Sequence, residues 1–141
     1  MFVKKLGLWL ACAFFLCACV FVRITNVCAF SAFSGEREFY LYSASSQAKT
    51  KRTLGLGELG DIKGESITLD GVERNAFLKE TLEAYTACVL WEETCADTTS
   101  YYCYSPRLQG GVLLNGKTVN LHIAFSKDKA KLGTPLIFGG F

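Results

Sequence analysis

The chain has 141 residues, which is enough for one domain with a buried core, and it carries 15 basic and 13 acidic side chains. Three of the basic residues, Lys4, Lys5 and Arg23, lie in an N-terminal stretch without acidic residues, so the remainder carries 12 basic and 13 acidic side chains. A near-neutral remainder lacks the positive charge that attracts nucleic acid, and we therefore expect no nucleic-acid partner.

The N-terminal stretch has the composition of an export segment. Lys4 and Lys5 precede the apolar run LGLWLACAFFLCACVFV (6–22). A basic head followed by an apolar run is typical of a signal peptide, although the run also approaches the length of a membrane span. We expect residues 1–30 to be a signal peptide or an uncleaved N-terminal membrane anchor, with cleavage possible after Ala29 or Ser31. Either alternative places the domain outside the cytoplasmic membrane, secreted or anchored.

Residues 31–38 are polar and predict a short tether, and 39–141 then form one small domain. The aromatic stretch 39–45 predicts a first strand, and the alternation in 65–70 predicts a second. A helix is expected from about 71 to 87, because Asp70 and Glu73 fit a capping box and apolar residues recur at helical spacing.

Further strands follow the helix. CVLW (88–91) predicts a buried strand, and YYCYS (101–105) predicts the next. Asn115-Gly116 is a strong hairpin signal, with flanking strands expected at Val112–Leu114 and, from the alternation of apolar and polar residues, at Thr118–Phe125. The final segment, LGTPLIFGGF (132–141), predicts a closing strand. The fold class is therefore α+β: a mostly antiparallel sheet of about six short strands, with one amphipathic helix packed on one face.

Three of the seven cysteines, Cys88, Cys95 and Cys103, lie in the domain. An exported domain can hold a disulfide, and the polar turn ADTTSYY between Cys95 and Cys103 favours a bridge between these two. Cys88 lies in an apolar run and is expected to be a buried thiol. The chain has no CxxC motif, so neither a redox dithiol nor a zinc site is predicted.

The stretch SYYCYSP (100–106) raises the question of a reactive cysteine. A nucleophilic cysteine needs a nearby base, and the only histidine is His122, so a Cys103–His122 dyad is an alternative to the disulfide. No catalytic motif surrounds either residue. We expect no catalytic residue, no metal site and no cofactor.

Strand alternation also predicts an interaction surface. Tyr102 and Tyr104 point to one side of their strand, while Cys103 points to the other. Exposed tyrosines are common in surfaces that recognise proteins or glycans. The candidate surface residues are Tyr40, Tyr42, Tyr102, Tyr104, Asn120 and His122. The expected partner is a protein or a cell-wall component, with the membrane as a further partner if the N-terminal segment stays attached.

The C-terminal stretch VNLHIAFSKDKAKLGTPLIFGGF (119–141) resembles the end of the YwmB-like family of exported, sporulation-associated proteins. The similarity lies in an N-L-x-I-A strand (120–124), a charged turn and an L-G-T-P-L segment (132–136). The resemblance implies an α+β fold of the kind found in the TATA-box-binding protein. It implies no catalytic residue.

These observations favour a non-enzymatic, exported module of the cell envelope, which is associated with sporulation or with the envelope itself. It would bind its partner through an open sheet face. The alternatives are a small extracytoplasmic thiol enzyme that uses Cys103 and His122, and DNA binding by fold analogy.

Overall fold

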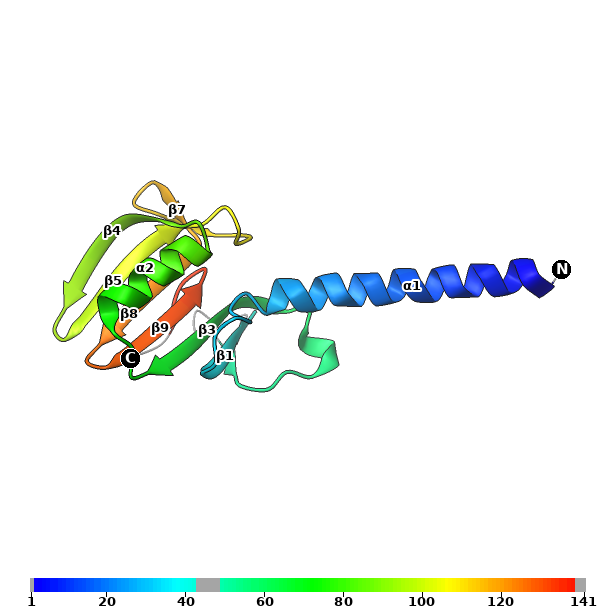
Figure 1. Ribbon diagram of the computed structural model, residues 1–141, viewed down its shortest axis with the longest axis horizontal. Coiled ribbons are helices and arrows are strands. Elements are labelled where there is room, and N and C mark those ends of the chain that lie inside the picture. Colours follow the sequence, from blue (N-terminus) through cyan, green and yellow to red (C-terminus); the bar gives the residue numbers. More distant parts are fainter. Residues whose placement is uncertain (1, 43–48, 139–141) are drawn as a thin grey trace.

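The computed structural model describes residues 2–42 and 49–138, including all side chains in these ranges except those of 2–6, 21–27 and 56. An N-terminal helix, α1 (Phe2–Val27), precedes a domain of mixed sheet and helix. Figure 1 shows α1 extending away from that domain. Within the described residues, no helix is both long enough and apolar enough to cross a membrane.

The domain is built on a seven-stranded sheet with the order β2-β1-β3-β9-β8-β5-β4, in which every neighbouring pair is antiparallel. The strands are β1 (Glu36–Leu41), β2 (Lys49–Lys51), β3 (Ile62–Asp70), β4 (Cys88–Cys95), β5 (Thr98–Tyr104), β8 (Leu121–Ser126) and β9 (Lys129–Thr134). A separate ribbon pairs β6 (Val112–Leu114) with β7 (Lys117–Val119). A 3-10 turn, η1 (Leu56–Glu58), lies between β2 and β3.

The helix α2 (Arg74–Ala84) lies across one face of the main sheet (Figure 1). The α+β class predicted from the sequence is thus confirmed, with more strands than expected. One reason is the short edge strand β2. Another is that the strand predicted from Thr118 to Phe125 is divided at Asn120 into β7 and β8.

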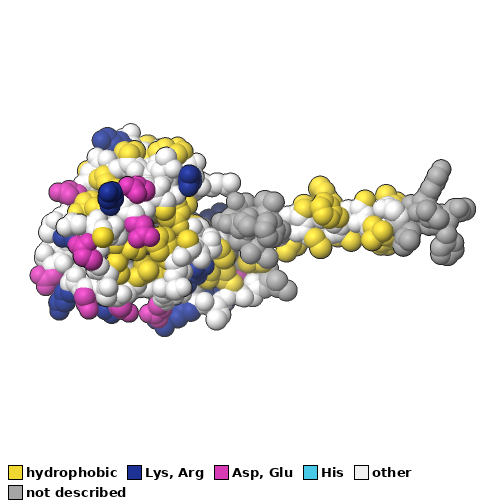
Figure 2. Space-filling model, viewed as in Figure 1, with side chains coloured by type: hydrophobic (Ala, Val, Ile, Leu, Met, Phe, Trp, Pro, Cys, Tyr) yellow, Lys and Arg dark blue, Asp and Glu magenta, His cyan; other side chains and the backbone are white. Residues whose placement is uncertain are grey.

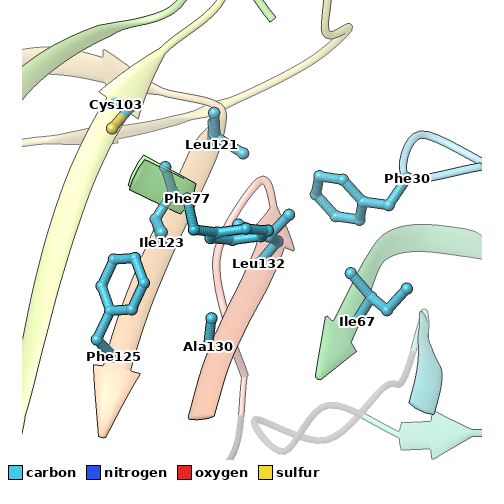
Figure 3. Close-up of a cluster of buried hydrophobic side chains, with 9 residues drawn as sticks. All are labelled: Phe30, Ile67, Phe77, Cys103, Leu121, Ile123, Phe125, Ala130 and Leu132. Atoms are coloured by element: carbon cyan, nitrogen blue, oxygen red, sulfur yellow. The ribbon is translucent and has the colours of Figure 1, made fainter. Parts of the chain in front are cut away.

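The core lies between α2 and the sheet. Figure 3 shows that its side chains come from α2, from four strands and from the loop that precedes β1. The fully or almost fully buried members are Phe30, Ile67, Phe77, Cys103, Leu121, Ile123, Phe125, Ala130 and Leu132. On β8 the alternating positions 121, 123 and 125 face α2, as the period of a strand requires. The opposite face of β8 contains His122 and Ala124.

The start of α2 differs from the prediction. Its N-cap is Glu73, whose carboxylate accepts hydrogen bonds from the N–H groups of Asn75 and Ala76. Asp70 is instead the last residue of β3, and Gly71 follows at φ 68° with its N–H bonded to the Asp128 carbonyl. That left-handed turn separates strand from helix, so a helix cannot begin at 71.

The predicted tether, 31–38, is part of the folded domain. Phe33 packs against Phe77 at a ring-centroid distance of 5.5 Å, and β1 already begins at Glu36. The Phe30 side chain is fully buried. The prediction of a tether was based on the average polarity of residues 31–38. The packing of Phe30 and Phe33 instead fixes this stretch on the domain.

The Asn115-Gly116 hairpin is confirmed. Both residues have positive φ, 49° and 73°, as a two-residue turn of type I′ requires. The closing strand predicted at 132–141, by contrast, ends early, and residues 139–141 lie outside the described part of the chain. β9 stops at Thr134, a cis peptide bond joins it to Pro135, and the segment 136–138 turns back toward the sheet.

Candidate functional site

Cys103 lies on the face of the sheet that α2 covers. It pairs with Leu121 of β8 and with Val89 of β4, and its side chain is fully buried in the core. Burial, with a smaller contribution from Cys88, raises the pKa of the Cys103 thiol to about 12. A thiol in this environment stays protonated at neutral pH and is a packing residue.

His122 lies on the opposite face. It pairs with Tyr102, the neighbour of Cys103 in β5, and residues at successive positions point to opposite sides of a strand. Its Nδ1 accepts a hydrogen bond from the Ile137 N–H at 3.2 Å, and burial lowers the pKa of the imidazole to about 4. The sheet therefore separates Cys103 from His122, and the Cys–His dyad is not formed.

The predicted Cys95–Cys103 disulfide is also wrong. Cys95 pairs with Thr98, at the far end of the β4–β5 hairpin from Cys103. Five residues of extended strand between Thr98 and Cys103 span roughly 16 Å, whereas a disulfide needs Cα atoms within about 7 Å. All the cysteines are free thiols, and Cys88 and Cys95 are exposed, so the prediction of a buried Cys88 fails as well.

Three aromatic rings stack on the face that α2 does not cover, and we call Trp91, Tyr102 and His122 the aromatic ladder. The Trp91 and Tyr102 rings lie 4.7 Å apart at 16°, and the Tyr102 and His122 rings lie 4.5 Å apart at 20°. These separations are close to the spacing of neighbouring strands, about 4.7–4.9 Å. The rings therefore stand upright on the sheet with their faces against each other; Trp91 and Tyr102 are half-buried, whereas His122 is buried.

The predicted surface residues fall into two groups. Tyr42 and Tyr104 are 68% and 40% exposed, and Tyr102 is half-buried with its hydroxyl 3.4 Å from a Glu93 carboxylate oxygen. The other three, Tyr40, Asn120 and His122, are buried, with 1%, 1% and 8% of their surface exposed. Their assignment to an interaction surface is therefore corrected.

Tyr40 and His122 are buried because residues 136–138, which we call the C-terminal segment, cross the sheet face that α2 does not cover. The Phe138 ring packs edge-on against Tyr40 at 5.1 Å, while Ile137 contacts His122. Gly133 permits this approach, because a Cβ at that position would lie 2.7 Å from Ile137 Cγ1. Tyr40 in turn donates a hydrogen bond to Ser66 Oγ at 2.8 Å.

Asn120 has a structural role. Its Oδ1 accepts a hydrogen bond from the Ser105 N–H at 2.7 Å, and its Nδ2 donates to the carbonyls of Ser105 and Leu108 at 2.7 and 3.0 Å. One side chain thereby satisfies three backbone groups of the turn that follows β5. Such fully satisfied buried amides fix a local conformation.

A buried carboxylate, which the sequence analysis did not single out, lies at the junction of α1 and the domain. Glu65 is 2% exposed; its Oε2 accepts a hydrogen bond from the Ala29 N–H at 2.8 Å, and its Oε1 is 3.3 Å from Arg37 Nη1. Oε1 accepts no hydrogen bond from any described residue. Burial raises the pKa of Glu65. This effect exceeds the lowering of the pKa by Arg37 and by the N–H groups of Ala29 and Phe30.

Glu65 escaped the sequence analysis because it begins the predicted strand 65–70, where an acidic residue at a strand end is expected to be solvated. Its partner, Ala29, is 36 residues away and lies in the export segment. An open groove passes beside this carboxylate, and its lining includes Ala29, Glu65, Tyr85 and Arg107. No group of three or more metal-binding side chains gathers anywhere in the described part of the chain.

Comparison of the chain with protein-family models, with the curated proteins and with the solved structures finds no match.

Proposed function

We propose that this chain is an exported, non-enzymatic module of the cell envelope, which binds a protein or cell-wall partner through the sheet face opposite α2. The observation that carries the proposal is the aromatic ladder together with the exposed ring of Tyr104 next to it. We call Trp91, Glu93, Tyr102 and Tyr104 the binding patch.

The composition of the patch fits protein recognition. Tyrosine and tryptophan edges present N–H and O–H groups beside apolar surface, and such residues are enriched where proteins bind each other. The patch also lies at the β4 edge of the main sheet, beyond which no further described strand is paired. Exposed strand edges offer backbone groups to a partner chain.

A protein is favoured over a glycan by the orientation of the rings. Sugars stack on exposed ring faces, but here the faces of Tyr102 are covered by Trp91 on one side and by His122 on the other. Within the ladder, the face of Trp91 that is turned away from Tyr102 remains for stacking. A patch that offers mainly ring edges and a carboxylate suits polar and apolar side chains of a protein partner.

Export is supported by the N-terminal helix. Its described large side chains are widely exposed, among them Trp9 at 75% and Phe14 at 77%. Figure 2 shows hydrophobic side chains along the part of α1 that is drawn in colour, away from the domain. An apolar helix whose described side chains are this exposed needs either removal or another apolar environment. The association with sporulation is the further proposal that rests on the resemblance of residues 119–141 to the YwmB-like family.

Site-specific photo-crosslinking in the producing organism tests the patch. A photoreactive phenylalanine replaces Tyr104, and the matched control carries it at Leu113, which is 73% exposed on the β6–β7 ribbon. We expect a discrete crosslinked product from position 104 and none from 113, with the yield reduced at least fivefold by Trp91→Ala. Identical products from both positions, or none from 104, would contradict the proposal. A product from position 104 that disappears on cell-wall digestion would identify the partner as a cell-wall component and not a protein.

A further inference from the structure

The junction between the export segment and the domain is organised around one peptide bond, Ala29–Phe30. Tyr85 donates its hydroxyl hydrogen to the Ala29 carbonyl at 2.8 Å, and Arg37 Nη2 donates to the Phe30 carbonyl at 3.1 Å. The Ala29 N–H donates to Glu65. Residues of β1, β3 and the end of α2 thus hold a stretch that the sequence assigned to a removable segment.

Phe30 belongs to the domain and not to the segment. Its ring is fully buried and packs edge-on against Tyr85 at 5.8 Å. Figure 3 shows it reaching from its loop toward the core residues of β3 and β9. Cleavage after Ser31, the second site offered by the sequence, would remove this ring from the core. Cleavage after Ala29 retains it as the first residue of the mature chain.

Among the described residues, the hydrogen bonding of the Glu65 carboxylate is incomplete. Oε1 has the Arg37 guanidinium in ion-pair contact but accepts no hydrogen bond from the described residues. A buried carboxylate usually accepts several hydrogen bonds or pairs closely with a charge. The backbone nitrogen of Phe30 lies near enough to this carboxylate to lower its pKa.

We infer that the chain is cleaved between Ala29 and Phe30 and that the new α-ammonium group of Phe30 forms a buried ion pair with Glu65. This inference rests on the export part of the proposed function. A signal peptidase of the exporting cell hydrolyses the Ala29–Phe30 amide with one water. The C–N bond breaks, Ala29 leaves as a carboxylate, and Phe30 gains a charged amino group with three N–H donors.

Charge and geometry agree with this arrangement. Loss of Ala29 removes one donor from Glu65, and the ammonium supplies up to three at the adjacent chain position. The groups facing the new pair are Arg37 from β1 and the Tyr85 hydroxyl from the end of α2, and the latter loses its acceptor when Ala29 leaves. In the uncleaved chain the Ala29–Phe30 bond is held within the fold, so cleavage precedes folding, as it does when a chain emerges during export.

The test uses the full chain, produced with its own N-terminal segment in a bacterium that exports it. Intact mass and N-terminal sequencing identify the first residue of the exported protein, and we expect Phe30. The folded protein is then acylated at its amines over a range of pH. We expect the Phe30 α-amine to react at least tenfold more slowly than in urea, with a pKa raised at least one unit above the ordinary ~7.7.

Two variants test whether Glu65 is the group that protects the Phe30 amine from acylation. Glu65→Gln should restore the reactivity of the Phe30 amine to within about threefold of the urea value, whereas Glu92→Gln, at an exposed position of β4, should leave it protected. If Glu65→Gln does not fold, the pH profile of the wild-type amine still decides the question. A mature N-terminus at Ala32, or a Phe30 amine as reactive in the folded protein as in urea, overturns the inference while export stands. A full-length, membrane-held product overturns both the inference and cleaved export.

Discussion

The imidazole of His122 and the backbone of Ile137 are joined by a hydrogen bond in which the Ile137 N–H donates to Nδ1 at 3.2 Å. This bond requires an unprotonated Nδ1. It therefore fastens the C-terminal segment to β8 only while His122 is neutral. Burial maintains that state by lowering the pKa of the imidazole to about 4.

The stability of the domain should therefore fall in acid. The pKa of His122 is lower in the folded chain than the ~6.5 of an unfolded histidine, so between pH 6.5 and 4 the unfolded chain binds a proton that the folded chain excludes. The stabilisation that comes from keeping His122 neutral in the folded chain is fully present above about pH 6.5. As the pH falls, the free energy of unfolding decreases, by roughly 2–3 kcal/mol near pH 4.5.

Urea unfolding of wild type and His122→Phe at pH 7 and at pH 4.5 measures this effect. The phenylalanine ring can retain the stack on Tyr102 but cannot titrate, so the variant should lose about 2–3 kcal/mol less than wild type between the two pH values. Comparison with the variant removes the contribution of the carboxylates, which titrate in both proteins. Equal losses would show that His122 is not the titrating group.

Gly133 controls how closely the C-terminal segment approaches the sheet. A Cβ there would lie 2.7 Å from Ile137 Cγ1 and 2.8 Å from the Ile137 nitrogen, and β9 pairs Gly133 directly with His122. Gly133→Ala should therefore displace the segment, lower the free energy of unfolding by about 1–3 kcal/mol, and raise the pKa of His122 toward ~6.5.

Because the chain contains one histidine, its imidazole proton resonances give an unambiguous NMR titration. Gly57→Ala is the control, since a Cβ at Gly57 meets nothing within 4 Å. A His122 pKa that is the same in Gly133→Ala as in wild type would mean that residues 136–138 do not bury the ring.

Features set by residues close together in the sequence could be predicted, whereas features set by contacts between distant residues could not. Asn115-Gly116 and the alternation from Val119 to Phe125 were recognisable because the turn and the strand period are encoded locally. The burial of Tyr40 and His122 was not, because their cover comes from a segment far along the chain. A sequence ending in LGTPLIFGGF is compatible with a strand and with a segment that folds back, and only the contact at Gly133 distinguishes them.

The same reasoning explains the errors at the candidate site. Cys95 and Cys103 are close in sequence, but a tight turn at Ala96-Asp97 makes the hairpin long, and the two cysteines lie at different levels of it. Glu65 was overlooked because its significance depends on Ala29 and Arg37. Neither β-propensity nor spacing reveals such a long-range pair of contacts.

Cys103 should be unreactive in the folded protein. Its thiol is fully buried and its pKa is raised to about 12, whereas Cys88 and Cys95 are exposed. Alkylation of the exported form, read by intact mass and peptide mapping, should modify Cys88 and Cys95 under native conditions. Cys103 should react only in denaturant. Rapid native labelling of Cys103, or a mass showing a disulfide with Cys95, would contradict the structure.

Asn120 should be the most sensitive polar position of the domain. It is 1% exposed and makes three hydrogen bonds to the backbone of Ser105 and Leu108. Asn120→Ala leaves one buried N–H and two carbonyls without this partner, and we expect a loss of about 2–4 kcal/mol in the free energy of unfolding. Asn120→Asp should cost at least as much at pH 7, because it retains the acceptor for Ser105 but brings a negative charge against the two carbonyls.

Urea unfolding followed by tryptophan fluorescence measures both losses, and Asn75→Ala is the matched control. Asn75 is exposed on α2 and its side chain makes no hydrogen bond to another described residue, so its replacement should change stability by no more than about 0.5 kcal/mol. A loss below about 1 kcal/mol for Asn120→Ala would mean that the turn after β5 holds its conformation without the amide. A large loss would instead identify Asn120 as the group that fixes where β5 ends, and with it the position of Tyr104 in the binding patch.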